Sequence, residues 1–318
     1  MKTNTVICGD SIKEIKKIND NYIHLILSDI PYGISFDSWD VIHNNTNSSL
    51  LGSSPAQTKS TVFKKRGKPL NGWSEADKNI PKEYYDWCLS WAGEWLRVLK
   101  PGASCFIFAG RRFSHRCICA MEDAGFIFKD MLAWEKDAAA HRAQNVKVIF
   151  ERRGDIDNVK KWDGWKIGNL RPLFEPILWF MKPYPIGGTL TDNIAQYNLG
   201  GYNEDYLKKN HLNNKGIEIC SNIIKCKTEP SDRGLHPAQK PIALMEFLIG
   251  LTTIENQIVL DPFCGCGSTL VAAKKLNREY IGIEKNKEYC ETISKRLNNT
   301  LDNEIYNFED VTAKSNYS

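Results

Sequence analysis

The sequence predicts an α/β fold built on a mostly parallel sheet of about seven strands, with helices on both faces. Two observations lead to this prediction. Short apolar runs recur along the chain, and stretches with helical periodicity lie between them. Several of the runs are apolar without alternation, which is typical of strands covered on both faces, and such strands belong to parallel sheets.

Four of the expected strands share one feature, because each ends at an acidic residue. They are residues 5–10 (TVICGD), 22–29 (YIHLILSD), 257–261 (QIVLD) and 280–284 (YIGIE). In open α/β sheets, ligands bind beyond the carboxyl ends of the strands. The acids therefore predict that the functional site lies along one edge of the sheet.

Three further strands and three helices complete the expected core. Strands at residues 104–110, 125–134 and 175–181 widen the sheet, and helices are expected at 11–18, 82–99 and 268–276. The last helix has a hydroxyl N-cap and lysines in its final turn. Trp and Tyr residues recur at helical spacing in 82–99, which favours a core-facing side over a base-stacking surface.

The composition is that of a globular protein, with 42% hydrophobic and 25% charged residues in 318 positions. The longest apolar runs fall well short of the roughly 20 residues that cross a bilayer, so no membrane partner is expected. The first ten residues read as a strand and not as an export signal, which predicts a cytoplasmic protein. Ten cysteines without a C-x-x-C pair are expected to stay reduced and to bind no metal.

Positive charge is concentrated in two segments, although the net charge is only +4. Residues 41–74 hold five basic and no acidic residues, and 136–182 hold ten basic and six acidic ones. Such segments can neutralise phosphates, although charge runs are more often solvated surface. Residues 41–80 are expected to form a long mobile basic loop. The candidate residues for binding the phosphates of a nucleic acid are Lys64, Lys65, Arg66, Arg142, Arg152 and Arg153.

The stretch DPFCGCGSTLVAA, residues 261–273, is expected to run from a strand through a glycine turn into a helix. A G-x-G sequence alone fits a structural turn as well as a cofactor site. Glu284 favours the cofactor, because it ends the next strand, 23 positions after Asp261, where an acid can accept both ribose hydroxyls. Leu270 stands where a dinucleotide site needs its third glycine, so an adenosine without phosphates fits better.

Three motifs together resemble the S-adenosylmethionine-dependent amino-methyltransferases of DNA, in their beta class. DIPY (29–32) resembles the catalytic tetrapeptide D-P-P-Y, HPAQKP (236–241) resembles the segment before the cofactor strand, and DPFCGCGST resembles the F-x-G-x-G cofactor loop. Their order, with the catalytic motif first, is that of the beta class. Ile30 replaces the first proline of the tetrapeptide but keeps the backbone carbonyl.

The resemblance implies a permuted Rossmann-like methyltransferase fold and S-adenosyl-L-methionine as cofactor. Residues 1–183 would form the catalytic part of the core, 184–235 a small irregular target-recognition insertion, and 236–318 the cofactor-binding part. The expected activity is site-specific methylation of the N6 amine of a flipped adenine in double-stranded DNA. A cognate restriction endonuclease and a homodimer are further candidate partners.

Alternative activities stay open at this point. A cytosine-N4 enzyme shares all the chemistry, but Asp29 favours adenine because Ser is more usual at this position in the cytosine enzymes. A non-DNA N-methyltransferase is less favoured because of the insertion and the basic loop. An inactive DNA-binding homologue is less favoured because Asp29, Tyr32 and the glycine loop are intact. A 5-methylcytosine enzyme would need a Pro-Cys nucleophile, which the sequence lacks.

The resemblance also assigns roles to residues. Asp29 and the Ile30 carbonyl would accept the two amine protons, Pro31 would fix the turn, and the ring of Tyr32 would stack on the base. Asp10 would lie near the adenine of the cofactor, although it could simply cap a helix, and Lys240 would anchor the cofactor carboxylate or face solvent. The cofactor-binding candidates are Asp10, Lys240, Asp261, Pro262, Phe263, Gly265, Gly267, Ser268, Thr269 and Glu284.

Overall fold

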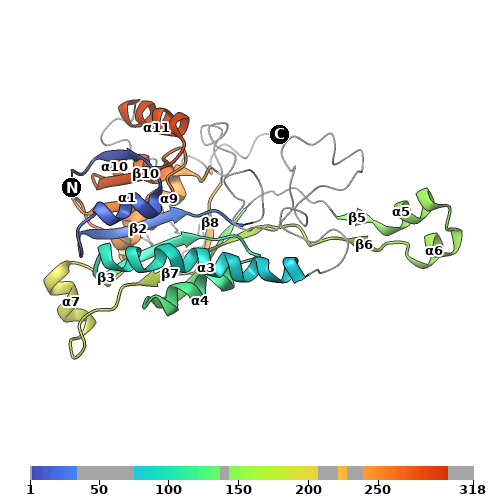
Figure 1. Ribbon diagram of the computed structural model, residues 1–318, viewed down its shortest axis with the longest axis horizontal. Helices are drawn as coiled ribbons and strands as arrows, with labels where there is room; N and C mark the ends of the chain where they lie inside the picture. Colours follow the sequence, from blue (N-terminus) through green and yellow to red (C-terminus); the bar gives the residue numbers. More distant parts are fainter. Residues whose placement is uncertain (1, 34–74, 137–142, 207–220, 228–238, 300–318) are drawn as a thin grey trace.

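A computed structural model describes residues 2–33, 75–136, 143–206, 221–227 and 239–299. Its centre is an eight-stranded sheet with the strand order β1-β10-β9-β2-β3-β7-β4-β8 (Figure 1). The strands are β1 (Thr5–Cys8), β2 (Ile23–Asp29), β3 (Leu99–Phe108), β4 (Ile127–Glu135), β7 (Phe174–Met181), β8 (Ile223–Lys225), β9 (Ile258–Asp261) and β10 (Glu279–Glu284).

The sheet is mostly parallel, which confirms the predicted α/β class. Neighbouring strands are parallel from β1 through β10, β9 and β2 to β3, and β7 is antiparallel to both β3 and β4. The count of eight strands corrects the expected seven. The additional strand, β8, pairs with β4 and lies in the segment expected to be irregular. Its three residues are too few to show a hydrophobic period.

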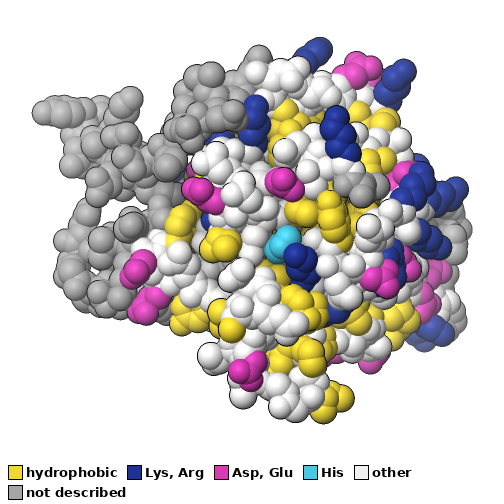
Figure 2. Space-filling view, turned by 90° about the vertical axis from the view of Figure 1, so that its left-hand side faces the viewer, with side chains coloured by type: hydrophobic (Ala, Val, Ile, Leu, Met, Phe, Trp, Pro, Cys, Tyr) yellow, Lys and Arg dark blue, Asp and Glu magenta, His cyan; other side chains and the backbone are white. Residues whose placement is uncertain are grey.

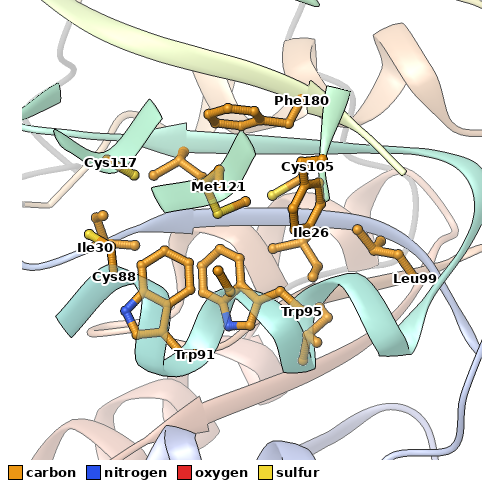
Figure 3. Packing of buried hydrophobic residues seen from close by; sticks show 14 of the residues in the cluster. Ile26, Ile30, Cys88, Trp91, Trp95, Leu99, Cys105, Cys117, Met121 and Phe180 are labelled. Carbon is orange, nitrogen blue, oxygen red and sulfur yellow. The ribbon is translucent and has the colours of Figure 1, made fainter. Parts of the chain in front are cut away.

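Helices cover both faces of the sheet. One face carries α1 (Ser11–Glu14), the 3₁₀ helix η1 (Ile15–Lys17), α3 (Glu75–Val98) and α4 (Ser114–Asp123); the other carries α9 (Ile242–Thr252), α10 (Ser268–Lys275) and α11 (Lys287–Asn299). Figure 3 shows Trp91 and Trp95 of α3 packed over the first face. The aromatic side of this helix therefore belongs to the core, as its spacing predicts.

Helix α3 begins earlier than expected, because it starts at Glu75 and continues through Pro81. The last residues of the expected 41–80 loop are therefore helical, and residues 34–74 lie outside the described part of the chain. The sequence analysis begins this helix at residue 82, directly after Pro81, whereas a proline inside a helix usually breaks it. Burial of Ile80, with 1% of its surface exposed, stabilises the turn that precedes the proline.

A long connection between β4 and β7 projects away from the sheet (Figure 1). It contains β5 (Gln144–Asn145), α5 (Val146–Arg153), α6 (Ile156–Lys161) and β6 (Lys166–Ile167), and residues 143–173 are called the arm below. The short strands β5 and β6 pair with each other and not with the main sheet. The segment expected to be irregular also contains a helix, α7 (Leu190–Tyr197), which packs near β3.

Two further observations concern the described residues only. None of their helices combines the length and the apolar character needed to cross a bilayer. The nine cysteines among the described residues are free thiols. The described residues also contain no group of three or more His, Cys, Asp or Glu side chains that could hold a metal ion.

Candidate active site

The catalytic and cofactor motifs meet in the middle of the sheet. Strand β2 ends at Asp29 and its parallel neighbour β9 ends at Asp261. From this pair, the neighbouring strands continue to β10 on one side and to β3 on the other, which makes it a topological switch point where ligands bind. The buried Ser28 hydroxyl donates a hydrogen bond of 2.7 Å to Asp261 Oδ1 and so joins the two strand ends.

The turn after β2 is held by packing. The side chain of Ile30 is 1% exposed and lies in the core with Cys88 and Trp91 of α3 (Figure 3). The Tyr84 hydroxyl, also from α3, donates a hydrogen bond of 3.1 Å to the Pro31 carbonyl. Burial of Ile30 thus fixes the turn at the position where related tetrapeptides carry a stiffer proline.

The ring of Tyr32 packs against the backbone at the end of β3. A Cβ atom at Gly110 would lie 2.8 Å from Tyr32 Cβ, which is closer than real carbon atoms approach. The absence of a side chain at Gly110 therefore allows the ring to occupy this place.

Four charged side chains gather around the Tyr32 hydroxyl. The hydroxyl donates to Asp29 Oδ1 at 2.9 Å and also contacts Glu175 at the start of β7. Lys240 Nζ donates to Asp29 Oδ2 at 2.6 Å and lies 3.1 Å from Glu175 Oε1. Lys136, which follows β4, forms an ion pair with the other oxygen of Glu175. Two carboxylates and two ammonium groups thus form one cluster.

Burial and charge shift the pKa values of this cluster in different directions. Burial raises the pKa of Asp29 to about 6, although the charge of Lys240 opposes the shift. For Glu175, burial would raise the pKa, but Lys240 and Lys136 outweigh it and hold the pKa at about 2. The two carboxylates likewise outweigh burial and raise the pKa of Lys240. At neutral pH, Asp29 is therefore an ionised hydrogen-bond acceptor.

The structure places Lys240 in this cluster, whereas the sequence analysis expects it at the cofactor. It also adds Glu175 and Lys136, which the sequence analysis misses. The sequence feature that could have identified Glu175 is its place as an acid at the start of an expected strand. Because β7 is antiparallel, its amino end lies at the same edge as the carboxyl ends of β2 and β3. Only the strand direction, which the sequence does not show, makes that acid informative.

The cofactor loop runs from β9 to α10 and is organised by two acids. Asp261 Oδ1 accepts a hydrogen bond from the Phe263 N–H at 3.2 Å. Glu284, at the end of β10, accepts the Gly265 N–H at 2.9 Å and the Asn286 N–H at 2.8 Å. Gly267 has φ of +83°, and a Cβ there would lie 2.9 Å from Ile293, so glycine is required on both counts.

Exposure divides the expected cofactor residues into two groups. Phe263 and Gly265 are partly exposed, as is Glu284, whereas the other loop candidates are buried. Burial raises the pKa of Asp261 to about 7, and its hydrogen bonds point inward to Ser28 and the loop. The buried candidates, which shape the loop and offer little surface to a ligand, are Asp261, Pro262, Gly267, Ser268 and Thr269.

The partly exposed residues fit a nucleoside. Each carboxylate oxygen of Glu284 accepts one backbone N–H and keeps a lone pair for a ribose hydroxyl. The Phe263 ring is fixed by packing against Trp87 and Trp95, with ring centres 5.8 and 6.1 Å apart. Asp10 lies beside Glu284, because the Gly9 N–H donates to the Glu284 carbonyl, and it caps α1 by accepting the Ile12 N–H at 3.1 Å.

The candidate DNA-binding residues are divided between the arm and the undescribed segments. Arg152 and Arg153 are exposed at the end of α5. Lys64, Lys65, Arg66 and Arg142 lie outside the described residues and stay predictions.

Comparisons with known proteins agree with this geometry. Residues 23–295 match the profile of the N6/N4 methyltransferases, described as DNA methylases. The chain is 57% identical over 302 residues to type II methyltransferase M.HindIII of Haemophilus influenzae, an overlap of 95% of this chain and 97% of that protein. It is 26% identical to type II methyltransferase M.HpaI of Haemophilus parainfluenzae, over 97% and 77% of the two chains.

Solved structures share the fold. The PvuII DNA methyltransferase, described as cytosine-N4-specific, superposes with a TM-score of 0.60 at 17% identity, over 98% of this chain and 91% of that one. The complex of M1.HpyAVI with S-adenosylmethionine superposes with a TM-score of 0.53 at 23% identity, over 92% of this chain and 98% of that one. With the family match over most of the chain, the protein belongs to the N6/N4 family of DNA methylases, enzymes that take their methyl group from S-adenosylmethionine.

Proposed function

We propose that this DNA methyltransferase acts on the N6 amine of an adenine that has been flipped out of double-stranded DNA. The observation that carries the proposal is the Asp29 carboxylate, ionised at neutral pH, at the end of the strand that adjoins the cofactor loop. Aspartate at this position favours adenine as the substrate base, since serine is more usual there in the cytosine-N4 enzymes of the beta class. Asp29 and the Ile30 carbonyl accept the two N–H groups, and Tyr32 stacks on the base.

The acceptors matter because the lone pair of an aromatic amine is delocalised into the ring. Holding both N–H groups at fixed acceptors localises that pair on nitrogen, so that it can attack a methyl group. The cofactor supplies this methyl group as a sulfonium, whose C–S electron pair stays on sulfur. The amine then carries a positive charge, which the Asp29 carboxylate stabilises, and its surplus proton passes to Asp29 or to water. Lys240 holds Asp29 Oδ2 during these events.

The proposed cofactor contacts follow from exposure. Glu284 binds the ribose hydroxyls, and the Phe263 ring and the Gly265 backbone contact the nucleoside, with Asp10 on the adenine side. The type II designation of M.HindIII and M.HpaI supports a restriction endonuclease as a partner that cuts the same sequence.

Mass spectrometry of nucleosides tests the choice of base. Unmethylated duplex DNA is incubated with the purified protein and S-adenosylmethionine, digested, and compared with an Asp29→Ala control. N6-methyladenine is expected in the wild-type sample alone. N4-methylcytosine in its place would assign the cytosine reaction, and neither product on duplex DNA would contradict the proposal.

A further inference from the structure

The arm exposes large apolar side chains and has no core of its own. No residue between 143 and 173 is buried. Near β6, the exposed fractions are 60% for Trp165, 57% for Ile167 and 88% for Leu170. Several large exposed apolar side chains within six residues of sequence are typical of an interaction surface, because their burial by a partner is favourable.

The same arm carries an excess of positive charge. Residues 143–173 contain seven basic and four acidic residues. Two of the acids are already engaged, since Asp163 pairs with Lys147 at 3.1 Å and Asp155 accepts the Asn158 N–H at the start of α6. Arg152 and Arg153 end α5 and form no ion pair among the described residues. The helical tip is therefore a cationic surface.

The position of the arm relates it to the active site. The arm connects Lys136 to Glu175, the two residues that form an ion pair in the catalytic cluster, and the Lys136 N–H donates to the Leu173 carbonyl at 2.7 Å. It extends beyond the edge at which β2 ends, with β5 and β6 between the sheet and the far tip, which α5 and α6 form (Figure 1). Any duplex that delivers a base to Asp29 must pass this edge.

The opposite side of the molecule has a different character. Figure 2 shows that its Lys and Arg side chains are scattered among acidic and apolar ones. The arm combines exposed apolar groups with Arg152 and Arg153, which form no ion pair among the described residues. A second copy of the chain would bring two such positive surfaces together, which charge repulsion disfavours.

We propose that the arm binds double-stranded DNA next to the flipped base. Arg152 and Arg153 at the tip contact phosphates, and the exposed apolar residues Trp165, Ile167 and Leu170, in and beside β6, lie against the major groove. The strands β5 and β6 form a two-stranded antiparallel ribbon, and the major groove is wide enough to admit such a ribbon. This inference rests on the proposed function for its duplex substrate, and it places DNA recognition also between β4 and β7.

The salt dependence of DNA binding tests the phosphate contacts. Anisotropy of a fluorescein-labelled duplex of mixed sequence is measured with the full chain and S-adenosylhomocysteine at several salt concentrations. Arg152→Gln/Arg153→Gln is expected to weaken binding and to reduce the log–log slope by about 1.8, since each lost phosphate contact removes ~0.9. The matched control is Lys16→Gln/Lys17→Gln on η1, before the start of β2, which should keep the wild-type slope.

A second variant tests the apolar surface. Trp165→Ala/Leu170→Ala is expected to weaken DNA binding about tenfold or more at an unchanged slope, because burial of such side chains is lost. Light scattering of the same samples gives the molecular mass. A mass that this variant halves relative to wild type would assign the surface to a second copy and overturn the inference.

Failure of the arm and failure of the proposed function give different results. If wild type methylates duplex DNA while both arm variants keep its affinity and slope, only the arm inference is wrong. If wild type neither binds nor methylates a duplex, the proposed function itself is wrong.

Discussion

The hydroxyl of Tyr32 links the stacking ring to the charged cluster behind it. If Tyr32 served only as a stacking surface, Tyr32→Phe would be mild. The structure shows that the hydroxyl donates to Asp29 and accepts from Lys240 at 3.1 Å. Bonds to charged groups contribute about 1.5 to 3 kcal/mol, so we expect Tyr32→Phe to slow single-turnover methylation about tenfold or more. Tyr32→Ala should be slower still, and a phenylalanine variant as fast as wild type would leave the ring as the sole contribution.

Asp29 is the residue on which the chemistry depends most directly. Asp29→Ala is expected to slow methyl transfer by about 100- to 1000-fold, because it removes a preorganised partner of the developing charge. Lys240 keeps Glu175 as a partner, so the fold and the binding of cofactor and DNA should persist. Asp29→Asn should be nearly as slow, since an amide stabilises positive charge poorly.

The control for this variant is Asp20→Ala, which removes an exposed carboxylate before the other end of β2. Both variants are compared by rapid-quench methylation under saturating DNA and cofactor. Near wild-type turnover of Asp29→Ala would refute the amine-binding role.

The pKa of Asp29 predicts how activity depends on pH. Protonation below about pH 6 removes the acceptor, so kcat/KM, which reports the free enzyme, should fall about tenfold per pH unit below that value. A raised native pKa means that the folded state takes up this proton more readily than the unfolded chain, so this group stabilises the fold as pH falls from 6. Asp261, with its pKa of about 7, acts in the same direction.

Glu175 affects the stability of the fold in the opposite direction, because its native pKa is lowered. The stability that its charge contributes is lost chiefly as the pH falls toward its pKa of about 2. Activity should therefore fall to about a tenth at pH 5 while the protein is still folded. Parallel measurements of kcat/KM and of circular dichroism across this range check the prediction. A flat pH profile would show that Asp29 does not titrate there.

The turn between β9 and α10 depends on Glu284, which belongs to the adjacent strand. Glu284→Gln is expected to raise the dissociation constant of S-adenosylmethionine by about tenfold or more, because charge-assisted hydrogen bonds to the ribose become neutral ones. DNA affinity should stay close to that of wild type. Glu279→Gln, at the other end of β10, is the matched control. Calorimetry that finds equal cofactor affinity for both variants would exclude Glu284 from the site.

Some elements of this fold could be predicted from the sequence because their residues carry local signals. The strands ending at Asp29, Asp261 and Glu284 are continuous apolar runs, and each ends where the sequence analysis places it. The catalytic tetrapeptide and the cofactor loop follow from these ends. Helix α9 lacks such a signal, because residues 244–252 are all buried and no polar face reveals a helical period.

Other features depend on the arrangement of strands and have no local signal. Glu175 and Lys136 belong to the site only because β7 runs against its neighbours. The position of Lys240 beside Asp29 joins segments more than 200 residues apart. Helix α7 has a capping box formed by Thr189 and Asp192, but it lies within a stretch whose glycines and asparagines suggest irregular structure.

On the scale of the whole molecule, the catalytic and cofactor segments share one core. The cluster on one face joins Ile26 of β2 to Leu260 of β9, and the cluster on the other joins Leu25 to Leu270 of α10. Neither segment can therefore unfold without exposing the other. We expect a single calorimetric transition that S-adenosylmethionine shifts to higher temperature, by a stabilisation of about 2.7 kcal/mol at 100 times the dissociation constant. Two transitions, of which the cofactor shifts one, would indicate separate domains.

The contact between β2 and β9 has a consequence for which amino acids can occupy position 28. The two strands pair only at Leu25–Val259 and Ile26–Leu260, and beyond these residues the Ser28–Asp261 hydrogen bond joins them. A larger side chain at position 28 would push the strand ends apart, and one without a hydroxyl would leave Asp261 with one partner fewer in a buried place. Natural variation at this position should therefore be narrow, even though Ser28 takes no part in the transfer of the methyl group.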